Sequence, residues 1–177
     1  MKNKEEIENI FKTSNSHEEL FDTFSIAIEN KYNDVELYKM LLANPALGTN
    51  EVIMFSEKIV KEFPSECYDL YYWIAELFSG QPFDVECYEK ALEYYLKVFE
   101  MNTDEHEPLI SALNLYNYDL DLSLNSDIIS TVEHGADLVK HRSKIYYPLA
   151  EHYNKIGDGD NYEKYSSLAN SAAKNEE

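Results

Sequence analysis

The sequence predicts an all-α protein made of antiparallel helix pairs, and three observations support this fold class. The composition is 44% hydrophobic, with 15 Tyr and 8 Phe but only 5 Gly and 5 Pro, which argues against disorder and against a turn-rich β fold. Apolar residues recur at helical spacing, and capping residues mark a helix boundary roughly every 15 to 20 residues. A chain of 177 residues fits a single domain, 1–177.

Helix starts are indicated by residues that can accept a hydrogen bond from the first turn of a helix. These are Ser16 with Glu19, Asn33 or Asp34, Asn50, Asp84, Ser126, and Asp160 with Glu163. Helix ends are indicated by Gly48, Gly80 and Gly157. Pro148 is expected in a first helical turn, because a proline in the middle of a helix would cost about 3 kcal/mol.

Between these boundaries the apolar spacing is helical. In residues 88–102, YEKALEYYLKVFEMN, one face collects Tyr88, Ala91, Leu92, Tyr95, Leu96, Val98 and Phe99. Similar faces occur in residues 21–28, 35–42, 55–63, 70–78 and 145–156. The pattern predicts about ten helices joined by short loops, so that neighbouring helices run antiparallel.

Residues 88–102 resemble the second helix of a tetratricopeptide repeat, with Tyr88, Ala91, Tyr95 and Val98 at its aromatic and small positions. The preceding YYWIAELFSG is similar to the first helix of that repeat, with Tyr71, Ile74, Ala75 and Phe78. The last unit repeats the scheme with Tyr146, Leu149, Ala150 and Tyr153, followed by Tyr162, Ala169 and Ala172. The resemblance implies a short tetratricopeptide-like solenoid with degenerate repeats.

The predicted organisation follows from these matches. Residues 1–33 form N-terminal helices, and residues 34–177 form about four helix pairs. The pairs begin near Val35, Ser65, Glu105 and Ser143.

Charge is the most unusual global property, because 34 acidic and 15 basic residues give a formal net charge of −19. From Glu66 to Asp137 there are 16 Asp or Glu and only two Lys, Lys90 and Lys97, a net of −14. Such a surface is a poor partner for nucleic acid or an anionic membrane. It is either simply a solvated acidic surface or a face that attracts a basic protein.

If the chain is a solenoid, the first helix of each pair lines a concave surface that can hold a partner. The predicted exposed residues of those helices are acidic and aromatic: Asp69, Tyr72, Glu76, Glu105, Glu107, Tyr147 and Glu151. Tyrosine suits an interface, because it offers a large contact area with a polar tip. The competing interpretation is that many of these tyrosines belong to the core.

Residues 117–127, NYDLDLSLNSD, break the helical spacing. Leucines at 120, 122 and 124 alternate with polar residues, which is the period of an extended segment. The segment is predicted either to lie across a helix groove or to protrude toward a partner. Its charged side is Asp119, Asp121 and Asp127, which we add to the predicted partner-binding residues.

No catalytic or metal-binding motif is present in the sequence, and no cofactor or enzymatic activity is expected. The five histidines are scattered, and neither HExxH, a Cys/His metal spacing, a phosphate-binding glycine loop nor a nucleophile elbow occurs. DEHEP at 104–108 is better explained as a solvated helix start than as a metal site. GDGDN at 157–161 lacks the central glycine and the glutamate of a calcium loop.

Two functional hypotheses remain open for a non-enzymatic, protein-binding module. The first is an acidic immunity or antitoxin-type protein that neutralises a basic, nuclease-like toxin. The second is a tetratricopeptide-type adaptor or secretion chaperone that holds an extended segment of a partner protein. With no apolar signal segment or membrane span in the sequence, a cytoplasmic location is expected. The oligomeric state is not indicated.

Overall fold

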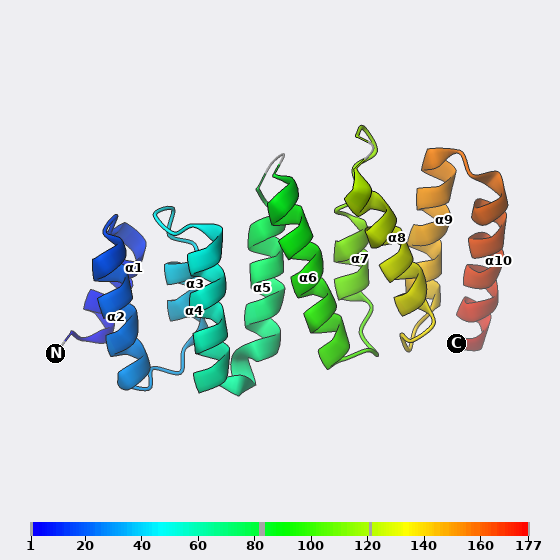
Figure 1. The fold of residues 1–177 in the computed structure, drawn as a ribbon. Helices are drawn as coiled ribbons and strands as arrows, with labels where there is room; N and C mark the ends of the chain where they lie inside the picture. The colour runs from blue at the N-terminus through cyan, green and yellow to red at the C-terminus, as the bar shows by residue number, and fades with distance from the viewer. Residues whose placement is uncertain (1, 82–83, 121, 177) are drawn as a thin grey trace. The chain divides into compact units, whose positions relative to one another are not determined.

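The computed structural model describes residues 2–81, 84–120 and 122–176, and the regular secondary structure of these residues is all helical (Figure 1). The chain divides into two compact units, residues 1–77 and 78–177. The predicted all-α class is therefore confirmed, and neighbouring helices pack against each other. The organisation of residues 1–177 as one domain stays a prediction.

Unit 1 contains two helix pairs and the beginning of a further helix. Its helices are α1 (Lys4–Thr13), α2 (His17–Glu29), α3 (Val35–Leu42) and α4 (Thr49–Glu62), then a 3-10 turn (Pro64–Glu66) and α5 (Cys67–Ser79), which ends in unit 2. Helix α1 packs against both α2 and α3, and α3 packs against α4. The fully buried side chains Ile7, Leu20, Leu41 and Ile59 come from four different helices and form one core.

Unit 2 continues with five helices. These are α6 (Val85–Met101), α7 (Glu107–Leu113), α8 (Ser123–Ala136), α9 (Ser143–Ile156) and α10 (Gly159–Glu176). Helix α7 packs against α6, α8 and α9, and α9 packs along α10. Of the residues that carry the repeat resemblance, Ala91, Val98, Leu149 and Ala169 are completely buried, as small and aliphatic repeat positions should be.

Several predicted helix boundaries are confirmed. The side chains of Ser16, Asp34 and Asp84 accept hydrogen bonds from the first turns of α2, α3 and α6. Helix α5 ends at Ser79, directly before Gly80. Gly157 ends α9 with φ of 79°, in the left-handed region that glycine adopts without steric cost.

Four predicted boundaries are wrong. Gly48 precedes α4 instead of ending a helix, because its backbone N–H donates to Glu51 Oε2 at 2.9 Å and α4 begins at Thr49, before Asn50. Helix α10 begins at Gly159, where Asp158 accepts from the backbone of Asn161 in place of the predicted Asp160. Helix α8 begins at Ser123, three residues before Ser126.

Pro148 lies inside α9 and not in its first turn. Helix α9 begins five residues earlier, at Ser143, and Pro148 has no N–H to donate to the carbonyl of Lys144. Among the described residues, no helix is long and apolar enough to cross a membrane.

Candidate functional site

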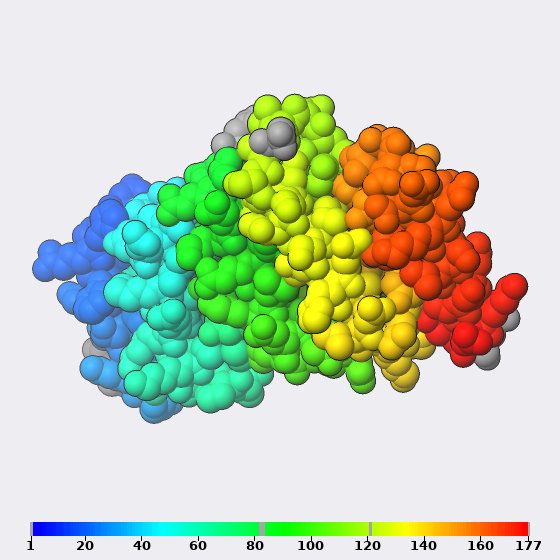
Figure 2. Space-filling model, turned by 45° about the vertical axis from the view of Figure 1, so that its right-hand side comes forward, coloured from blue at the N-terminus to red at the C-terminus, as the bar shows by residue number. Residues whose placement is uncertain are grey.

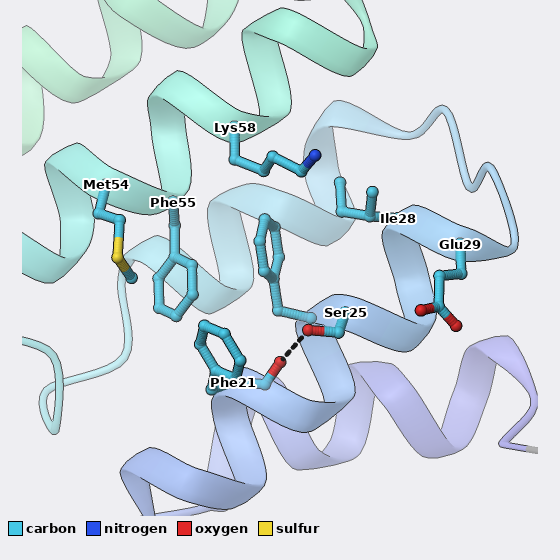
Figure 3. A pocket seen from close by; sticks show the side chains of 8 residues that line it. Phe21, Ser25, Ile28, Glu29, Met54, Phe55 and Lys58 are labelled. Atoms are coloured by element: carbon cyan, nitrogen blue, oxygen red, sulfur yellow. Dashed lines mark hydrogen bonds between the residues drawn. The ribbon is translucent and has the colours of Figure 1, made fainter.

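An open apolar groove lies between α2 and α4 in unit 1 (Figure 3). It encloses about 370 Å³. Its lining residues are Phe21, Phe24, Ser25, Ile28 and Glu29 of α2, and Met54, Phe55 and Lys58 of α4. The two helices run in the same direction, because His17 near the start of α2 meets Glu51 near the start of α4.

The groove has a packed aromatic floor and a partly exposed apolar rim. Phe24 and Phe55 are only 4% and 2% exposed, and their ring centroids are 4.6 Å apart. Phe21 and Met54, in contrast, are 51% and 47% exposed. In Figure 3 these two side chains, one from each helix, lie beside the floor ring of Phe55. The groove therefore presents apolar surface to solvent on both of its edges.

Ion pairs join the two helices beyond each end of the groove. At one end His17 Nδ1 is 2.8 Å from Glu51 Oε1, and hydrogen bonding from the backbone of Gly48 and from His17 lowers the pKa of Glu51. At the other end Glu62 accepts from Lys31 at 2.7 Å and from Lys58 at 2.9 Å. These two lysines hold the pKa of Glu62 at about 2.

The outer edge of α2 is acidic. Glu18, Asp22 and Glu29 are exposed, follow helical spacing along one side of α2, and form no ion pair with the described residues. On α4, Lys58 lines the groove but is bound to Glu62, and Lys61 is exposed one turn further on. The carboxylates that border the groove without an ion-pair partner among the described residues therefore lie on α2.

The predicted partner-binding residues are distributed over both units. Asp69, Tyr72 and Glu76 lie on α5, in unit 1, where the two carboxylates are exposed and Tyr72 is half-buried. In unit 2 the exposed residues are Glu105 before α7, Glu107 in α7, Asp119 before α8, Asp127 in α8, and Tyr147 and Glu151 in α9. Asp121 lies outside the described residues.

The prediction that residues 117–127 form an extended segment is partly wrong. The second half of this segment, from Ser123, begins α8, and the connector between α7 and α8 comprises the described residues 114–120 and 122. Asn125 of α8 closes the connector, because its side chain donates to the carbonyls of Asn117 and Leu120 at 2.8 and 3.0 Å. Figure 2 shows yellow-green surface of this region beside yellow α8.

The connector is fastened to α9 by an aromatic cluster. The hydroxyl of Tyr118 lies 3.1 Å from Nδ1 of His152, and the ring of Tyr116 meets the His152 ring edge-on at 4.4 Å. His152 is only 1% exposed, and among the described residues its Nε2 has no hydrogen-bond partner. Burial lowers the pKa of His152, because it disfavours the charged form of the ring.

A second cluster in unit 2 places two tyrosines on one carboxylate. Tyr153 of α9 and Tyr165 of α10 both donate to Oε1 of Glu133, at 2.8 and 2.6 Å, and their rings stack with centroids 5.5 Å apart. Tyr146 donates to Asp137 at 2.7 Å, and burial with this bond raises the pKa of Tyr146 to about 12. These residues join α8, α9 and α10, and their hydroxyls are engaged inside the protein.

Sequence reasoning missed both the groove and the Glu133 cluster. Residues 21–28 and 55–63 were expected to be buried faces, and on α2 this holds for Phe24 and Ile28 but not for Phe21. A signal was present, since Leu20, Phe24 and Ala27 define the buried side of α2 and Phe21 lies off its centre. Glu133 was counted only as one of the acidic residues.

The described residues contain no group of three or more His, Cys, Asp or Glu side chains that could hold a metal ion. Comparison with protein-family models, with curated proteins and with solved structures gives no significant match to this chain.

Proposed function

We propose that this chain is a non-enzymatic protein-binding module of the immunity or antitoxin type, which binds and neutralises a basic, nuclease-like toxin. The observation that carries the proposal is the unpaired acidic surface of unit 2. Within its described residues, Asp119, Asp127 and Glu151 are exposed and have no basic side chain as an ion-pair partner.

Unpaired carboxylates on one molecule repel each other, and a basic partner relieves that repulsion while it is attracted to the surface. Such complementarity raises the association rate and favours basic partners over acidic ones. Nucleic acid is disfavoured by the same field, so the ligand that fits the charge is a basic protein. A nuclease-like toxin is a protein of this kind, because its own substrate is a polyanion.

We also propose that the helix pairs stack as a short tetratricopeptide-like solenoid. Two contacts between α2 and α4, His17 with Glu51 and Phe21 with Phe55, join residues 34 positions apart, which is the period of that repeat. The first helices of successive pairs pack together in each unit, α1 with α3 and α7 with α9. Both observations support the solenoid arrangement.

The test of the toxin hypothesis is a low-salt pull-down from the native host, eluted with a salt gradient and read by mass spectrometry. We expect one stoichiometric basic protein whose toxicity or nuclease activity disappears when this chain is added. Recovery of several unrelated proteins that share an extended segment would instead support the adaptor or chaperone hypothesis.

Charge reversal then tests the surface itself. Replacing Asp119 and Asp127 with Lys should slow association with the basic partner about tenfold at low salt and weaken its salt dependence. The matched control is Asp160→Lys with Glu163→Lys, which makes the same change in net charge at exposed positions of α10. If both pairs of substitutions slow association equally, net charge alone acts and the proposed surface is wrong.

A further inference from the structure

The groove between α2 and α4 has the surface chemistry of a docking site. Phe21 and Met54 are half exposed on its two edges, above a floor formed by Phe24 and Phe55. A ligand that covered Phe21 and Met54 would remove their apolar surface from water. The floor would not need to rearrange, because its rings are already packed. The next two observations identify the class of occupant.

The first observation is that the groove offers few hydrogen-bonding partners besides the carboxylate of Glu29 at its edge. The hydroxyl of Ser25 already donates to the carbonyl of Phe21 at 3.0 Å, and the ammonium of Lys58 is bound to Glu62. An extended peptide lying here would bury its backbone N–H and C=O groups without partners, which is costly. A helix satisfies its own backbone, so the occupant that fits is helical.

The second observation is the charge along the edges. Glu18, Asp22 and Glu29 give the α2 edge three carboxylates with no ion-pair partner among the described residues. An occupant with Lys or Arg along that edge gains three possible ion pairs, whereas an acidic one is repelled. On the α4 side, Glu51 and Glu62 are already paired with His17 and Lys58, so that edge offers no comparable set of carboxylates to a second row of basic residues.

We propose that this groove binds the apolar face of an amphipathic helix from a partner protein, with lysine or arginine along the edge that faces α2. The lined stretch of α2, from Phe21 to Ile28, is about 10 Å long, enough for anchors at i, i+3 or i+4, and i+7 of the partner. The inference rests on the proposed protein-binding function and adds a second contact, in unit 1, to the acidic surface of unit 2.

Two methionines make a matched pair of probes for this proposal. Met54 lies in the groove and is 47% exposed, while Met101 of α6 is 48% exposed and lies in unit 2. The methyl groups of both methionines are labelled with ¹³C, and a synthetic peptide of Leu and Lys is titrated into the protein. The peptide is about five helical turns long, and as a helix it carries its leucines in one stripe and its lysines along one edge of that stripe. The control peptide has the same composition in scrambled order, hence the same charge but no stripe.

We expect the striped peptide to shift the Met54 methyl resonance saturably and to leave Met101 unchanged. Replacing Phe21 and Met54 with Ser, and reading binding by peptide fluorescence, should weaken affinity about tenfold. Both side chains are half exposed, so the fold should persist, which circular dichroism checks. The control Ile156→Ser removes a similarly exposed apolar side chain of unit 2 and should leave binding unchanged.

The orientation of the bound helix, with its basic edge toward α2, is tested by charge-reversal substitutions. Replacing Asp22 and Glu29 with Lys should weaken striped-peptide binding about fivefold, whereas Glu89→Lys with Glu100→Lys at exposed positions of α6 should change it less than twofold. Equal shifts of Met54 with the striped and scrambled peptides, or a shift of Met101 without Met54, would overturn the helix-binding proposal. Neither result bears on capture of a basic toxin by the acidic surface of unit 2, so the two proposals fail separately.

Discussion

Glu176, near the end of α10, caps the start of α9 through Ser143. The backbone N–H of Ser143 donates to Oε1 of Glu176 at 3.1 Å, and its hydroxyl donates to Oε2 at 2.5 Å. The two residues are 33 positions apart. A negative charge at the first turn also interacts favourably with the helix dipole. The start of α9 is thus fixed by the helix that follows it.

We therefore predict that Glu176→Ala destabilises the protein by about 1 kcal/mol, the usual cost of losing a helix cap, measured by urea unfolding. Lys174→Ala, at an exposed position of the same helix end, is the control and should be close to neutral. Partial burial raises the pKa of Glu176, but the bonds from Ser143 outweigh it and the net pKa lies below the ordinary 4.5.

Because this pKa is lower in the folded state, the stabilisation is present above about pH 4.5 and is lost as the pH falls through the folded value. The difference in stability between the protein and Glu176→Ala should accordingly shrink on acidification. A difference that stays constant from pH 7 to pH 3 would show that Glu176 does not act as a charged cap.

Gly135 permits the close approach of α8 to α7. A Cβ atom at this position would lie 2.6 and 2.9 Å from the two terminal carbons of Leu109, which is only 1% exposed. Gly135→Ala should destabilise by about 1 kcal/mol, because overpacking of 1 to 3 kcal/mol exceeds the gain of nearly 1 kcal/mol in helix propensity.

The matched control is Gly159→Ala, in the first turn of α10, where an added Cβ meets nothing within 4 Å. This substitution should be neutral or slightly stabilising in thermal melts. Adding Leu109→Ala to Gly135→Ala should make the pair less destabilising than the sum of the two single changes, since the clash is removed. Strict additivity would contradict the proposed contact.

Glu62 should titrate far below an ordinary glutamate. Its carboxylate is paired with Lys31 and Lys58, which hold its pKa at about 2 compared with 4.5. The pairing therefore contributes above about pH 4.5 and is lost as the pH falls toward 2. NMR titration of the side-chain carboxyl should give a midpoint that rises in high salt or on Lys31→Ala, because the ion pairs are exposed and screened.

Tyr118→Phe should loosen the connector without unfolding unit 2. The substitution removes the hydroxyl that lies 3.1 Å from His152 Nδ1, at a cost of about 1 kcal/mol. Amide hydrogen exchange should accelerate at Asp119 and Leu120 and stay unchanged in α10. Tyr162→Phe, at a similarly exposed tyrosine of α10, is the control. Unchanged exchange at Leu120 would mean that Asn117 and Asn125 alone hold the connector.

The helix boundaries that were predictable are those whose determinants are local. Ser16, Asp34 and Asp84 bond to backbone groups two or three residues away, so a short stretch of sequence contains the whole interaction. The start of α9 was not predictable in this way, because its first turn is bonded by Glu176, 33 positions away, and Pro148 lies inside the helix instead of in that turn. The start of α8 was also predicted wrongly, because the alternation of leucines at 120, 122 and 124 with polar residues suggested an extended segment.

The sequence predicted that the acidic residues of the candidate site are exposed, but it did not predict the groove. Asp119, Asp127 and Glu151 are exposed as expected, because carboxylates without partners stay in water whatever the fold. Whether Phe21 or Met54 is covered depends instead on how α2 and α4 approach each other. Similarly, Glu133 binds Tyr153 and Tyr165 only because α8, α9 and α10 converge.

The stacked pair of Tyr153 and Tyr165 gives unit 2 a fixed aromatic reporter, as the stacked pair of Tyr68 and Tyr72 does for unit 1. The only tryptophan of the chain, Trp73, lies on α5 within unit 1, so its fluorescence reports on that unit. The rings of Tyr153 and Tyr165 are nearly parallel, at 5°, and held by one carboxylate, a fixed asymmetric arrangement that produces near-ultraviolet circular dichroism. Trp73 fluorescence reports on unit 1 and the tyrosine dichroism on both units. The two signals from one unlabelled sample therefore coincide if the chain melts in a single cooperative transition and separate if the units melt in succession.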